Sequence, residues 1–128
     1  MRTWLVNLIK TDPLIAADVD DRVWARNSRN TSVLTKPYII YSLGVSSTMG
    51  LHDEEDAEQQ YLQIWIHDEP GDYSRIDRIA DNLKVRLVGA GSAPDRVMTI
   101  LWLETSQEFD DETMETFYRY VRFRAIRS

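Results

Sequence analysis

The residues with the clearest potential for chemistry are one histidine and the acids that follow it, His52-Asp53-Glu54-Glu55-Asp56. Clustered carboxylates are the ligands that hard cations such as Ca²⁺ prefer, so this run is a candidate metal site for hydrolysis. Consecutive residues in one loop cannot all point at one ion, however, and the glycine-containing spacing of a calcium loop is absent. We therefore expect a solvated acidic loop. A small metal-dependent enzyme stays as an alternative, to be tested by changing His52, Asp53 or Glu54.

Other catalytic patterns are missing from the sequence. The chain has no cysteine, which excludes thiolate nucleophiles, disulfides and zinc–thiolate sites. The motifs GxSxG, HExxH, GxxxxGK and GxGxxG do not occur. Asp77 and Asp81 share one side of an expected helix, but Arg78 and Lys84 beside them favour a surface role. We therefore expect no enzyme, no metal site and no cofactor.

The negative charge of the chain is concentrated in two segments. The chain has a net charge of −6, with 15 basic and 21 acidic residues. Residues 50–60 and 104–115 contain no Lys or Arg and hold all but ten of the acids, so the rest of the chain is net positive. Such loops repel nucleic acid at close range. A sheet that recognises RNA is also disfavoured, because its basic, aromatic strand motif is missing.

Length and composition indicate one globular domain over residues 1–128. A chain of 128 residues can bury a core without disulfides or metals. Its contents of 43% hydrophobic and 28% charged residues are ordinary for a globular protein. No long apolar run follows the N-terminus or occurs elsewhere, so neither a signal peptide nor a membrane span is expected.

Helical spacing of apolar residues predicts a short first helix over about residues 2–10 and one long helix over 72–88. Asp12-Pro13 is typical of a new helix start, with Asp at the N-cap and Pro at the first helical position. Asp72 or Ser74 is expected to cap the long helix, and Gly89 to follow its end. One stripe of this helix should pack on a sheet.

Alternating apolar residues predict strands over about 22–24, 38–45, 60–67, 97–105 and 115–126. Trp65 falls on the outward face of its strand, where a large aromatic ring suggests cover by another segment or subunit. The strand at 97–105 is apolar on both faces, which is typical of a central strand or one facing a partner. The expected alternation sets Val97, Leu101 and Leu103 against Met98, Ile100 and Trp102.

These elements predict an α+β fold. We expect a mixed, mostly antiparallel sheet of four to five strands, with the long helix and the short N-terminal helical segment packed on it. Short connections around the long helix make the strands before and after it parallel. The two acidic segments should then emerge at opposite ends of the sheet.

The order of these pieces resembles the tail terminator, or tail completion, proteins of long-tailed (siphovirus-type) bacteriophages. The resemblance covers nearly the whole chain and is carried by DRVW, KPYIIYSLG, YLQIWIHDEPGDYSRIDRIADNLKVRLVG and ETFYRYVRFRAI. It implies a non-enzymatic virion protein, made in the host cytoplasm, that needs no cofactor. Such proteins form a hexameric ring that caps the tail tube, ends tail polymerisation and joins tail to head. The implied partners are further copies of the chain, the tail tube protein and a head-side neck or connector protein, while DNA only passes through the channel.

Two kinds of surface are expected to serve such a ring. Apolar side chains beyond the core would contact the next subunit, and basic ones on the last strand would meet its acidic loops: Trp65, Met98, Ile100, Trp102, Arg119, Arg122 and Arg124. Acids would face the channel or a neighbouring ring: Asp53, Glu54, Glu55, Asp56, Glu108, Asp110, Asp111 and Glu112. Another neck protein, such as an adaptor or stopper, and an unrelated binding module remain as alternatives.

Overall fold

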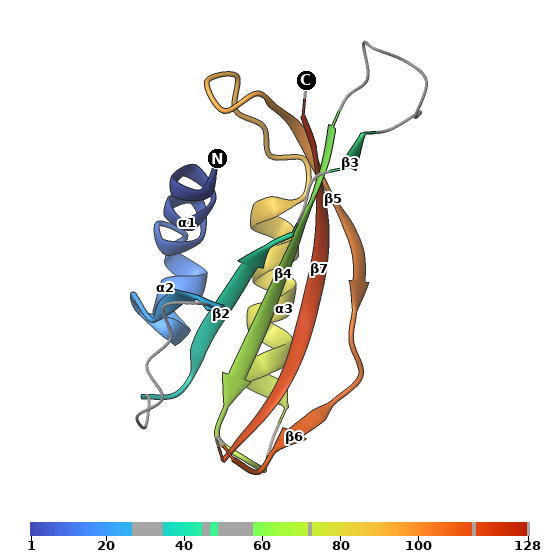
Figure 1. Cartoon of the computed structure of the whole chain (residues 1–128). Helices are drawn as coiled ribbons and strands as arrows, with labels where there is room; N and C mark the ends of the chain where they lie inside the picture. Colours follow the sequence, from blue (N-terminus) through green and yellow to red (C-terminus); the bar gives the residue numbers. More distant parts are fainter. Residues whose placement is uncertain (27–34, 45–46, 49–57, 72, 114, 128) are drawn as a thin grey trace.

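The computed structural model describes residues 1–26, 35–44, 47–48, 58–71, 73–113 and 115–127 (Figure 1). The elements follow in the order α1 (Arg2–Lys10), α2 (Pro13–Val19), β1 (Val23–Ala25), β2 (Tyr38–Leu43), β3 (Ser47–Thr48), β4 (Glu58–Asp68), α3 (Ser74–Leu87), β5 (Val97–Thr105), β6 (Phe109–Asp111) and β7 (Thr116–Arg127). Within these ranges, no helix has the length and apolar character needed to cross a membrane.

The strands form one mixed sheet in the order β1-β2-β4-β7-β5, with β3 beside β4 and β6 beside β7. Every pairing is antiparallel except that of β1 with β2. The expected α+β class and mostly antiparallel sheet are therefore confirmed. In the described part of the chain the sheet has seven strands where four to five were expected, because β3 and β6 are only two and three residues long and carry no alternating pattern.

The strands on either side of α3 run in the same direction, as expected, but they do not pair. Both β4 and β5 are antiparallel to β7, which lies between them. β7, the last strand along the chain, therefore lies inside the sheet and not at its edge. It pairs with β4 from Phe117 to Arg127 without interruption.

The helices cover one face of the sheet. In Figure 1, α3 runs along the β4–β7 pair, and α1 and α2 pack against it near β2. The core lies between these helices and the sheet, and all its members are at most 4% exposed, among them Ile64, Ile66, Ile79, Leu83 and Phe123. We call the opposite side of the sheet the helix-free face; it carries the alternate residues of each strand, including Ile40, Trp65, His67, Tyr118 and Arg122.

The helix boundaries follow their sequence signals in part. The side chain of Asp12 accepts a hydrogen bond of 3.0 Å from the backbone N–H of Leu14, so it caps α2 as expected. Gly89 adopts a φ of +83° just after α3, which a residue with a Cβ rarely adopts. The expected cap at Ser74 is wrong, because Ser74 is the first residue of α3 and Tyr73 occupies the N-cap position; Asp72 lies outside the described residues.

The expected alternation along β5 does not hold. Its pairing with β7 shifts between Val97 and Thr99 and again between Trp102 and Glu104. These β-bulges reverse the facing of the residues that follow. Ile100 is therefore 0% exposed in the core, whereas the four exposed large hydrophobics of the strand are Met98, Leu101, Trp102 and Leu103. β5 is also an edge strand, so its apolar character does not come from a central place in the sheet.

Candidate functional site: the helix-free face of the sheet

A row of aromatic rings crosses the helix-free face from strand to strand. Tyr38, His67 and Tyr118 are direct cross-strand partners on β2, β4 and β7. Their ring centroids are 4.9 and 5.0 Å apart, and Phe109 of β6 continues the stack 5.1 Å beyond Tyr118. Cross-strand aromatic pairs stabilise a sheet, so this row holds the strands together on the side that no helix covers.

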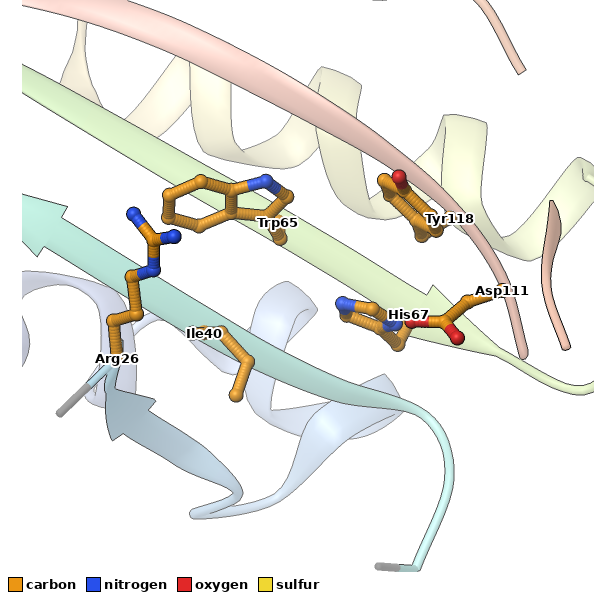
Figure 2. A pocket seen from close by; sticks show the side chains of 6 residues that line it. All are labelled: Arg26, Ile40, Trp65, His67, Asp111 and Tyr118. Atoms are coloured by element: carbon orange, nitrogen blue, oxygen red, sulfur yellow. The ribbon is translucent and has the colours of Figure 1, made fainter. Parts of the chain in front are cut away.

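His67 is the buried polar member of this row. Its Nδ1 lies 2.8 Å from Oγ1 of Thr116, and the two residues are 4% and 0% exposed. In Figure 2 the carboxylate of Asp111 points toward the same ring. The hydrogen bond and the stacked rings fix the imidazole in place, as expected for a packing role.

Two adjoining hollows lie on this face. The first, of about 190 Å³, is lined by Arg26, Ile40, Trp65, His67, Asp111 and Tyr118 (Figure 2). The second, of about 390 Å³, is lined by Arg26, Ser42, Gly44, Tyr61, Leu62, Gln63, Trp65 and Arg122, and includes no acidic side chain. Arg26 and Trp65 border both hollows.

The cover expected over Trp65 comes in part from its own chain. The guanidinium carbon of Arg26 lies 5.3 Å from the centroid of the Trp65 ring, a cation–π geometry. Trp65 nevertheless remains half-buried and lines both hollows, so its ring is accessible to a partner. Sequence reasoning overlooked Arg26, which follows β1 at the start of a polar segment and carries no pattern of its own.

The three arginines of β7 that were expected at an interface, Arg119, Arg122 and Arg124, do not share one surface. Arg119 points to the helix side, where its Nε lies 2.9 Å from Asp77 and its Nη2 2.9 Å from Glu108. Its other Nη donates to the backbone oxygen of Ser106 at 3.0 Å. Arg119 is thus paired with two acids of its own chain.

Arg122 and Arg124 lie on the helix-free face. Arg122 donates to Glu104 at 2.8 Å, and this hydrogen bond raises the pKa of the guanidinium. Both side chains of that pair are about half exposed, at 48% and 47%. Arg124 donates to the side-chain oxygen of Gln59 at 2.9 Å. These two arginines remain accessible, as a role at an interface requires.

The expected acidic sites fall into separate groups. Asp53, Glu54, Glu55 and Asp56 lie outside the described residues. Glu108 pairs with Arg119, and Asp111 lines the first hollow. Asp110 and Glu112 are exposed around the turn from β6 to β7. β6 lies beside the start of β7, and β3 lies beside the start of β4, so the strands that border the two acidic segments are at opposite ends of the sheet.

Asp68 is a second buried polar residue with a structural partner. Asp68, at the end of β4, is 3% exposed and accepts a hydrogen bond of 2.6 Å from Nε of Arg75 on α3. This bond raises the pKa of Arg75 and ties the helix to the strand. In the described ranges, no group of three or more His, Asp or Glu side chains is arranged to hold a metal ion, and residues 52–56 are not among those ranges.

Comparison with known proteins identifies a shared fold. No family model and no curated protein matches the sequence. A chain from a solved structure, "Virion of native gene transfer agent (GTA) particle", matches with a TM-score of 0.73 and 18% sequence identity. The match covers 96% of this chain and 90% of that chain. The two chains therefore have the same fold over almost their whole lengths.

Proposed function

We propose that this chain is a structural protein of a phage-type virion, a tail terminator that forms a ring on the end of the tail tube. The observation that carries the proposal is the fold it shares with a chain of a gene transfer agent virion, over 96% of its length. The order of sequence segments that resembles phage tail terminators supports the same conclusion independently of that match.

The surface of the chain has the features that a ring subunit needs. Among the described residues, no helix covers one face of the sheet, and that face contains two hollows. Edge strand β5 exposes Met98, Leu101, Trp102 and Leu103, half of the large hydrophobics exposed in the described part. Apolar groups gathered on one exposed element are typical of sites where proteins associate. Met98, Trp102 and Trp65 are therefore proposed as contacts between subunits.

The buried polar groups favour assembly over catalysis. His67 is held by Thr116, and Asp68 by Arg75, so each of these groups has a role in packing. In the proposed ring, six copies contact the tail tube protein on one side and a head-side neck or connector protein on the other. The ring ends tail polymerisation and lets DNA pass through its channel, in the tail–neck region of the virion.

Light scattering across a concentration series, with negative-stain images of the same samples, tests the proposal. The expected result is a six-subunit ring with a central hole wide enough for duplex DNA. The measurement is repeated with polymerised tail tube protein of the same virion, where rings should cap the tube ends. A chain that stays monomeric at every concentration and leaves the tube ends bare would overturn the proposal. Rings that bind the head-side connector but never the tube would instead identify a neck adaptor or stopper.

A further inference from the structure

The chain carries two surfaces of opposite charge at different places on the sheet. The first is the second hollow of the helix-free face, bordered by Arg26 and Arg122. The other is the acidic tip, which we define as Asp110, Glu112 and Glu115 around the turn from β6 to β7. Arg122 lies six residues along β7 from the first residue of that strand, Thr116, which is about 20 Å at the rise of a strand. A contact between the tip and Arg122 therefore joins two copies.

The hollow offers hydrogen-bond donors and an aromatic floor. A guanidinium carries N–H donors on three nitrogens, and the side chain of Arg122 uses Nη1 for Glu104. Arg26 is exposed and lies over the ring of Trp65. A carboxylate that enters the hollow would meet both cations beside apolar rings, where charge-assisted hydrogen bonds are stronger than in open water.

The acidic tip offers the matching acceptors. Within the described part of the chain, the carboxylates of Asp110, Glu112 and Glu115 make no ion pair and no hydrogen bond, and all three residues are exposed. Their neighbour Glu108 differs, because Arg119 already binds it. Three like charges at one turn repel one another, so a cationic partner would stabilise them.

We propose that the acidic tip of one copy docks into the second hollow of the next copy, with carboxylates of the tip bound to Arg26 and Arg122. This inference rests on the proposed ring and names the contact that builds it. The two docked surfaces are unlike, so the contact is heterologous and can repeat around a closed ring. The proposed contact uses Arg26, which the sequence-based expectation did not include, and does not use Arg119, which it did.

Charge reversal on each surface tests the contact. Variant R26E/R122E has an acidic hollow, and variant D110K/E112K has a basic tip. Each places like charges against each other in a homomeric ring, so the apparent association constant of each is expected to fall at least about a hundredfold. All four positions are exposed, so the variants should keep the fold, which circular dichroism and the melting temperature verify.

An equimolar mixture of the two variants gives the decisive result. The acidic tip of R26E/R122E fits the unchanged hollow of D110K/E112K, and the basic tip of the latter fits the reversed hollow of the former. Rings in which the variants alternate are therefore expected to return, and native mass spectrometry would find three copies of each in a ring of six. A single chain with all four changes should form rings by itself.

Matched controls separate this contact from a general effect of charge. K10E/R78E makes the same charge change on the helical side, and Arg78, like Arg122, is an exposed arginine that belongs to an ion pair. D21K/D81K matches the change at the tip with exposed residues elsewhere. Both controls should assemble as the unchanged chain does.

The possible failures are distinguishable. Normal rings from R26E/R122E alone, or two folded variants whose mixture does not recover, would overturn the docking contact and leave the ring in place. If the unchanged chain forms no ring with or without tail tubes, the proposed function fails, and the docking contact fails with it.

Discussion

Oγ1 of Thr116 lies 2.8 Å from Nδ1 of His67, and both side chains are buried where β4 and β7 meet. Thr116 is the first residue of β7 and is paired with Asp111 of β6, so this bond joins the small β6–β7 corner to the end of β4. The same imidazole stacks between Tyr38 and Tyr118. One hydrogen bond thus fixes the ring at the centre of the aromatic row.

Replacing Thr116 by Val should destabilise the fold. The substitution keeps the shape of the side chain but removes the hydroxyl group bonded to His67, and a buried polar atom that loses its partner costs about 1–3 kcal/mol. Urea unfolding of both proteins measures the change in the free energy of unfolding. Thr99→Val on β5 is the control, since that residue is half-buried, and it should change the free energy by less than about 0.5 kcal/mol. Equal effects at the two positions would contradict a specific role for the His67–Thr116 bond.

Arg119 should stabilise the folded monomer more than Arg122, which lies on the other face of β7. It binds Asp77 of α3, Glu108 and the backbone of Ser106, with 19% of its side chain exposed. Arg119→Met keeps the aliphatic stem and should cost about 1–2 kcal/mol, because the two acids are themselves about half exposed and partly screened by water. Arg122→Met breaks one exposed pair and should cost less than about 0.5 kcal/mol. Unfolding by heat or by urea measures the loss of stability in both variants. A larger loss for Arg122→Met than for Arg119→Met would contradict a stabilising role for Arg119.

The stability of the chain should depend on pH through Asp95. The N-terminal ammonium group, 2.8 Å away, and the hydroxyl of Ser92 lower the pKa of this carboxyl. Because the pKa is lower in the folded state, the ionised carboxylate stabilises the fold fully above the unfolded-state pKa of about 3.9. This stabilisation is lost as the pH falls through the folded-state pKa. The difference in unfolding free energy between the unchanged chain and Asp95→Asn should therefore be constant near neutral pH and shrink below about pH 4.

Urea unfolding at a series of pH values measures this difference. Asp21→Asn serves as the control, because Asp21 is exposed and has no side-chain partner within the described residues. The free energy of unfolding of Asp21→Asn should differ little from that of the unchanged chain at every pH. An Asp95→Asn difference that does not vary with pH would contradict the contribution of the ionised carboxylate.

The sequence predicts the elements of this fold well because their signals are local. The stripe of α3, the Asp12 cap and the alternation of β4 each depend on residues close together in the chain. The place of β7 between β4 and β5 depends on pairing between distant segments, which no local pattern encodes. No local sequence pattern marks the second hollow either, because Arg26 and Arg122, which line it, are far apart in the chain.

The face of β7 on which Arg119 lies could have been predicted from the sequence. Arg119 lies two residues from Phe117 and from Val121 and shares their face toward the helices, whereas Arg122 shares the other face with Tyr120. The period of a strand thus separates the two arginines. The same rule failed on β5 for a physical reason, since a bulge adds a residue to one strand and no sequence pattern marks it when both faces are apolar.

Truncation of Ile100 and of Met98 should have opposite effects on stability and assembly. Ile100 is fully buried, so Ile100→Ala should lower the free energy of unfolding by about 2–5 kcal/mol. Met98 is 62% exposed on edge strand β5, so Met98→Ala should change it by less than about 0.5 kcal/mol. If β5 contacts the next subunit, Met98→Ala should nevertheless weaken ring formation measured by light scattering. A stable, fully assembling Met98→Ala variant would remove Met98 from the interface, whereas a harmless Ile100→Ala would contradict the bulge that turns Ile100 into the core.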